Sequence, residues 1–124
     1  MIPRRPPRPA MLAWLAMFAA IATGSLLPAG DLPPPAFDGI DKLEHLAGYG
    51  LLSGWSVLLF ERRDARLRAM LAAIAFGVAV EIAQGVLTAT REPDVLDAVA
   101  NSIGALLGQL LAFTPLAGRL RARA

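Results

Sequence analysis

The chain has 124 residues, 56% of them hydrophobic, and a formal net charge of +2. Its mean hydropathy of +0.53 makes it more apolar than an ordinary soluble domain. The length allows one domain, residues 1–124. Because there is no cysteine, disulfides, thiolate metal sites and cysteine nucleophiles are excluded.

The apolar residues lie in long blocks. A helix rises about 1.5 Å per residue, so about 20 apolar residues cross the roughly 30 Å hydrocarbon core of a bilayer. Four blocks approach this length. We therefore predict an all-α polytopic membrane protein, a bundle of four transmembrane helices at about residues 10–27, 41–60, 67–89 and 93–113.

The first apolar block also has features of a signal peptide. It follows a basic segment and contains the small residues "AIA" at 20–22, as a cleavage site does. Cleavage would leave three spans in the same orientation. Because the apolar run continues to Leu27, we expect this helix to be retained, and cleavage stays open as the alternative.

The positive charges predict the orientation of the bundle. Short loops that are rich in arginine stay in the cytoplasm, and the three arginine groups would all lie on one side of a four-span bundle. Both termini are therefore expected to be cytoplasmic. Three small groups at membrane edges do not form a nucleic-acid interface. The groups are Arg4, Arg5 and Arg8; Arg62, Arg63, Arg66 and Arg68; and Arg119, Arg121 and Arg123.

Polar side chains recur at helical spacing in the outer halves of the last three predicted spans. An ionised side chain at the bilayer centre costs about 3 kcal/mol on insertion scales. We therefore expect these faces to turn toward one another and to form a pocket in the outer leaflet. The predicted ligand-binding residues are Asp41, His45, Tyr49, Glu81, Gln84, Arg91, Asp94, Asp97 and Asn101.

A stripe of small residues continues the polar face of the last predicted span. Gly104 and Gly108 follow Asn101 at helical spacing, and such stripes allow helices to pack closely in a bilayer. Pro115 is expected to end or bend this helix.

Three segments carry a family resemblance. "DKLEHLAGYGLL", "EIAQ" and "REPDVLDAVANSIGALLG" resemble the VanZ-like family of small bacterial membrane proteins over about residues 40–110. The resemblance implies a multi-pass protein of the inner (cytoplasmic) membrane that belongs to the cell envelope. The family's namesake is associated with low-level teicoplanin resistance, and relatives occur near envelope and exopolysaccharide genes. The resemblance implies no established reaction.

Binding of the head group of an envelope lipid or lipid-linked precursor is the favoured function. Lys42 and Arg91 lie at the outer rim, where a phosphate would arrive. One alternative is a membrane-embedded enzyme acting on such a lipid, with Glu81 and His45 as candidate acid or base. A structural partner subunit of an envelope or exopolysaccharide system is another. A proton- or ion-coupled transporter fits less well, because the inner half offers few polar residues.

No cofactor is expected. The chain has one histidine and no local pair of ligands. A divalent metal at His45, Glu81 and Asp97 is the less favoured alternative, since imidazole with carboxylates suits Mn, Fe or Zn.

Overall fold

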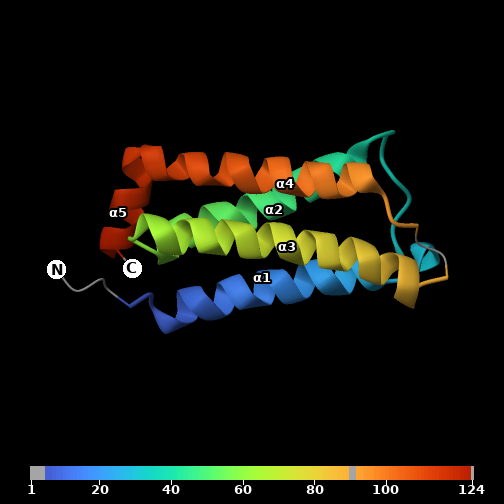
Figure 1. Cartoon of the computed structure of the whole chain (residues 1–124), viewed down its shortest axis with the longest axis horizontal. Helices are drawn as coiled ribbons and strands as arrows, with labels where there is room; N and C mark the ends of the chain where they lie inside the picture. Colours follow the sequence, from blue (N-terminus) through green and yellow to red (C-terminus); the bar gives the residue numbers. More distant parts are fainter. Residues whose placement is uncertain (1–4, 90–91, 124) are drawn as a thin grey trace.

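The computed structural model describes residues 5–89 and 92–123, and this part of the chain consists of helices and their connections (Figure 1). The elements are the helices α1 (Arg8–Leu26), α2 (Ile40–Leu59), α3 (Arg63–Leu87), α4 (Val95–Gln109) and α5 (Pro115–Arg123), with 3-10 turns η1 (Ala29–Asp31) and η2 (Leu110–Phe113).

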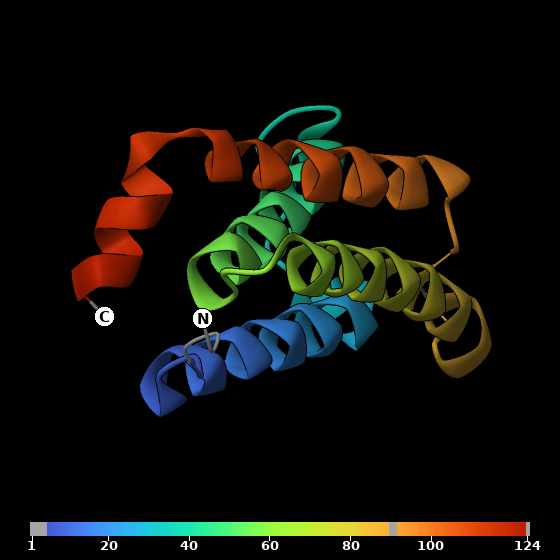
Figure 2. The same cartoon turned by 60° about the vertical axis from the view of Figure 1, so that its left-hand side comes forward.

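The four predicted helices are present, with shifted ends. α3 begins at Arg63 rather than at residue 67, because the charged residues of its first turn favour a helix although they are not apolar. The fourth helix begins two residues later than predicted and ends at Gln109, where η2 continues it to Phe113. Pro115 then starts α5, which turns away from the axis of α4 (Figure 2). Proline is well suited to a first helical position.

The helices run back and forth between two ends of the molecule (Figure 1). The start of α1, the turn between α2 and α3, and α5 lie at one end. The long loop after α1 and the connection from α3 to α4 lie at the other. The described arginines of the three groups are therefore gathered at one end of the bundle.

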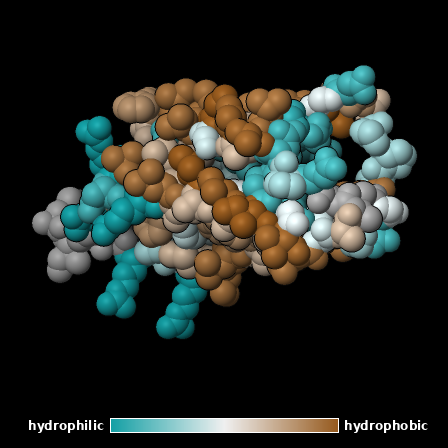
Figure 3. Space-filling view, turned by 45° about the vertical axis from the view of Figure 1, so that its right-hand side comes forward, coloured by the Kyte–Doolittle hydropathy of each residue, from teal (hydrophilic) through white to brown (hydrophobic). Residues whose placement is uncertain are grey.

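Three of the helical segments in the described part are long and apolar enough to cross a membrane: α1, α3, and the stretch Val95–Phe113. α2 is of similar length but carries three charged residues in its first two turns. Large apolar side chains cover the outside of the bundle, and charged side chains gather toward its ends (Figure 3). Such an extensive apolar surface suits a lipid environment rather than water.

The closest helix pair is α2 with α4. A Cβ at Gly104 would overlap the backbone carbonyl of Leu46, and one at Gly108 would lie 2.5 Å from the carbonyl oxygen of Gly50. Gly50 and Gly54, four residues apart on α2, face Gly104 and Gly108. The two backbones therefore touch through glycine on both sides, and this contact fixes the register of α2 against α4.

α1 packs on the outside of α2 and α3 and has no fully buried residue. Indole groups make two hydrogen bonds between α1 and α2: Trp14 Nε1 donates to the Leu52 carbonyl at 2.9 Å, and Trp55 Nε1 donates to the Ala10 carbonyl at 3.0 Å. Phe18 packs edge-to-face on Phe76 of α3, with ring centroids 5.0 Å apart. α1 is held by side chains, in contrast to the backbone contact of α2 with α4.

We expect Gly104→Ala to lower the free energy of unfolding by about 3 kcal/mol, the upper end of the usual cost of overpacking, because backbone rather than a side chain must move. The measurement is detergent-solubilised unfolding followed by circular dichroism. Gly118→Ala is the matched control, since a Cβ there meets nothing within 4 Å. Equal stability of the two variants would contradict the close α2–α4 contact.

Candidate functional site

Polar side chains from three helices converge near the end of the bundle that carries the long loop. Those of α2 come from its first three turns, those of α3 from its C-terminal half, and those of α4 from its N-cap and first two turns. We call this set the polar cluster; its described members are Asp41, Lys42, His45, Tyr49, Glu81, Asp94, Asp97 and Asn101.

Lys42 bridges the starts of α2 and α4. Its Nζ lies 2.7 Å from Asp94 Oδ2, 2.6 Å from Asp97 Oδ1 and 2.8 Å from Asp41 Oδ2. An ammonium group has three donors, so these three carboxylates use all of them. Lys42 therefore neutralises acidic neighbours and does not present a free charge at the rim, where the sequence had placed it as a phosphate contact.

Asp94 links all three helices. Its side chain accepts from the Leu96 amide at 2.8 Å and so caps α4, while its own backbone amide donates to Glu81 Oε2 of α3 at 3.0 Å. The Lys42 ammonium and then the Leu96 amide hold the pKa of the Asp94 carboxyl below its usual range. Asp94 is therefore a structural junction whose charge also favours the start of α4.

His45 is held by α4. Its Nδ1 lies 2.8 Å from Asn101 Oδ1, and its Nε2 lies 3.6 Å from Asp97 Oδ2. An amide oxygen only accepts, so Nδ1 carries the hydrogen. The Nε2 contact is too long for a hydrogen bond. In a neutral ring, the Nε2 lone pair would therefore face a carboxylate oxygen.

Three buried polar atoms of the cluster have no hydrogen-bond partner: the Tyr49 hydroxyl, Glu81 Oε1 and Asn101 Nδ2. Their side chains are nearly inaccessible, since Glu81, the most exposed of the three residues, is 6% exposed. Gly77 leaves the space they need, because a Cβ there would lie 2.9 Å from Asn101 Nδ2. Each such atom costs about 1–3 kcal/mol, so packing of the helices alone does not account for three in one cluster.

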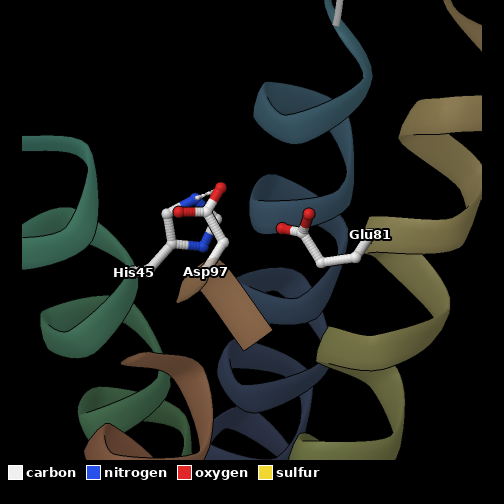
Figure 4. A group of neighbouring side chains, drawn as sticks. All are labelled: His45, Glu81 and Asp97. Atoms are coloured by element: carbon white, nitrogen blue, oxygen red, sulfur yellow. Dashed lines mark ion pairs between the residues drawn. The ribbon is translucent and has the colours of Figure 1, made fainter. Parts of the chain in front are cut away.

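His45, Glu81 and Asp97 could hold a metal ion. Each offers one ligand atom, and these atoms all lie within 4.8 Å of one another. Figure 4 shows the Glu81 carboxylate reaching from α3 toward the imidazole and the Asp97 carboxylate. One imidazole and two carboxylates are also the elements of an acid–base pair.

A cavity of about 160 Å³ lies between α1 and α2 and reaches the polar cluster at His45 and Tyr49. An engineered cavity of about 150 Å³ accommodates benzene, so this one has room for a single small chemical group. A Cβ at Gly24 would meet nothing within 4 Å, which shows how open the α1 wall is. The lining residues are Ala20, Ile21, Gly24, Ser25, Glu44, His45, Gly48 and Tyr49.

The α1 wall was not part of the predicted site. Ala20 and Gly24 stand four residues apart, and Ser25 follows, which is the signal of a small-residue face that could have indicated it. Motif resemblance could not, because it began at about residue 40.

Two further predicted site residues, Gln84 and Asp41, lie outside the cavity. Gln84 is buried, but its Nε2 donates to the Ser25 carbonyl at 2.8 Å, so it ties α3 to α1. Asp41 is exposed at the rim, where it contacts Lys42. Arg91 lies outside the described residues.

A second polar group lies further along the α2–α4 contact. Gln109 Nε2 lies 2.7 Å from Ser53 Oγ, and Ser53 Oγ in turn donates to the Ala105 carbonyl. Ser56 Oγ donates to the Ser53 carbonyl at 2.6 Å. These side chains satisfy one another across two helices, which is the behaviour of packing residues in membranes.

The fold and the polar cluster define a small helical membrane protein with a buried polar site. The model of the VanZ/LLP1 family matches residues 10–117. The chain belongs to this family, and the match includes α1. No curated protein and no solved structure matches the chain.

We expect Lys42→Met to lower the free energy of unfolding by about 2 kcal/mol, less than for a fully buried pair, since it removes the charged partner of the mostly buried Asp97 carboxylate. Arg68→Met is the matched control: its pair with Asp64 is at least half exposed on both sides and should contribute under about 1 kcal/mol. Thermal unfolding in detergent measures both. Similar losses in the two variants would show that Lys42 is no more than a surface residue.

Proposed function

We propose that this VanZ/LLP1 protein is a four-span protein of the bacterial inner membrane that binds the head group of an envelope lipid or lipid-linked precursor. The observation that carries the proposal is the cavity between α1 and α2, which joins the apolar outer surface to the polar cluster. A lipid could keep its chains in the bilayer and place its head group beside His45 and Tyr49.

The proposal takes α2 as the fourth span. The charges that lower its hydropathy lie in its first turns, and Lys42 is paired there with three carboxylates, which lowers the cost of burying them. The rest of the helix is packed, with Leu52 and Val57 fully buried. The described arginines lie at the opposite end of the bundle, which supports cytoplasmic termini.

Cysteine labelling tests this topology, because the natural chain has no cysteine. An impermeant maleimide added to intact cells should label Ala36→Cys, in the loop after α1, and should not label Asp64→Cys, at the start of α3. Labelling of Asp64→Cys after the membrane is permeabilised is the control. Labelling of both variants in intact cells, or only of Asp64→Cys, would contradict the proposed orientation.

The chemistry of the cluster favours a head group that donates hydrogen bonds. Asp41, Asp94 and Asp97 outnumber Lys42, Glu81 adds a further acidic group, and Glu44 lines the adjoining cavity. Carboxylates only accept hydrogen bonds, so hydroxyl or ammonium groups are the natural partners. The cavity volume restricts the inserted part to about half a dozen non-hydrogen atoms. An amine or one sugar hydroxyl edge fits, and the sequence predicts that Arg91 contacts the lipid phosphate.

Native mass spectrometry of gently solubilised protein tests the binding. The wild type should retain a phospholipid or polyprenyl-phosphate adduct, and Gly24→Leu should lose it, because the new side chain fills the cavity without altering a charge. Gly118→Leu, remote from the cavity, should retain it. Arg91→Ala should weaken the adduct if the phosphate lies at the rim.

An adduct that survives Gly24→Leu would place the lipid elsewhere on the protein. Masses without an adduct in every variant would favour a structural partner subunit of an envelope system.

An enzyme acting on the same lipid is the second candidate, and the unpartnered Glu81 Oε1 is the observation that favours it. Glu81→Gln separates the two: it should spare lipid retention in a binding protein and abolish turnover in an enzyme. A role in teicoplanin resistance belongs to the same proposal and is supported by membership of the VanZ/LLP1 family.

A further inference from the structure

We propose that His45, Glu81 and Asp97 bind a divalent transition-metal ion inside the bundle. The ligand atoms come from three different helices and all lie within 4.8 Å of one another. Sequence alone offered no local pair of ligands, so the site exists only through the packing of α2, α3 and α4 (Figure 4).

The first argument is the direction of the imidazole. Asn101 Oδ1 accepts from Nδ1, and this contact directs Nε2 toward Asp97 Oδ2 at 3.6 Å. The two atoms are too far apart for a hydrogen bond. A cation between them would take both as ligands.

The second argument is Glu81. Its Oε2 accepts from the Asp94 amide at 3.0 Å, while Oε1 is buried without a hydrogen-bond partner. A buried carboxylate oxygen without a donor is costly, and Glu81 belongs to the same group of ligand atoms as His45 and Asp97. A bound cation would supply the missing partner.

The third argument is that each proposed ligand side chain is held in place by a second contact. Asn101 holds His45, Lys42 holds Asp97 through Oδ1, and the Asp94 amide holds Glu81. Such outer contacts are typical of metal sites, where they set the tautomer and direction of the ligands. Lys42 uses the Asp97 oxygen that faces away from His45, so it leaves Oδ2 available.

The ligand set selects the class of ion. Imidazole suits Zn²⁺, Fe²⁺ and Ni²⁺, while carboxylates suit harder ions such as Mn²⁺ and Mg²⁺. One imidazole with two carboxylates therefore favours Mn²⁺, Fe²⁺ or Zn²⁺ over Mg²⁺ and Ca²⁺. Three protein ligands leave coordination positions open toward Tyr49 and the cavity, where a lipid oxygen or water can bind.

The test is equilibrium binding of Mn²⁺ and Zn²⁺ to chelator-treated, detergent-solubilised protein, with Mn²⁺ followed by its electron paramagnetic resonance signal. We expect one ion per chain, undisturbed by excess Mg²⁺. Glu81→Gln and Asp97→Asn should abolish binding in the same concentration range, and Asn101→Ala should weaken it by about 10- to 100-fold. Glu61→Gln, an exposed acidic residue at the opposite end of the bundle, should bind as the wild type does.

A second experiment, in which metal binding produces a new absorption band, applies if these variants fold poorly. Because the chain has no cysteine, His45→Cys with Cd²⁺ should show a thiolate-to-metal charge-transfer band that weakens when Glu81→Gln is added. Ala36→Cys is the control for a bare thiol and should not depend on Glu81.

No stoichiometric uptake by the wild type, or uptake that Glu81→Gln leaves unchanged, would overturn the proposal. Either result would mean that His45, Glu81 and Asp97 hold the three helices together without a metal. The experiment uses no lipid, so it stands or falls independently of head-group binding.

Discussion

The ion pairs of the Lys42 ammonium are the interaction on which the polar cluster depends. One flexible side chain from the first turn of α2 gathers three carboxylates and thereby allows the starts of α2 and α4 to share one end of the bundle. Without it, Asp94 and Asp97 would lose the positive charge that both carboxylates contact. Asp94 also connects this network to α3, because its backbone amide donates to Glu81.

The cluster has a graded polarity. At the rim, Asp41 is exposed and its charge is paired. One to two turns deeper, His45 and Asp97 are mostly buried and incompletely bonded, and deeper still Tyr49 and Glu81 keep unpartnered atoms. Hydrogen bonding therefore becomes less complete as burial increases, which is the reverse of what stability alone would favour. The contacts at the rim stabilise the fold, and the unpartnered atoms of the interior are the basis of the binding proposals.

Much of this could be predicted from the sequence because helical spacing is local. The spacing of His45 and Tyr49, and of Asp97 and Asn101, places each pair on one helix face wherever the helix lies. The partner of Lys42 could not be predicted, since it depends on the register between α2 and α4, which the facing glycines set through space. The early start of α3 was missed because the criterion was hydropathy, and charged residues form helices well.

The α1 residues that line the cavity could not be predicted from the sequence either. Gly24 and Ser25 carry no charge and no motif, and only the three-dimensional position of α1 over α2 makes them part of the cavity. The buried Gln84 resembled a ligand in the sequence, yet its amide serves to hold α1 in place. A polar residue in a span can thus attach a helix or line a site, and spacing does not distinguish the two.

The weaker attachment of α1 has a consequence for access to the cavity. α2 and α4 touch backbone to backbone, whereas α1 contributes no fully buried residue and is fastened by a few side chains. Separating α1 from α2 therefore costs much less than separating α2 from α4. The cavity lies at this weaker contact. In the proposed head-group binding, a displacement of α1 would therefore open a lateral path from the membrane plane while α2, α3 and α4 keep the polar cluster in register.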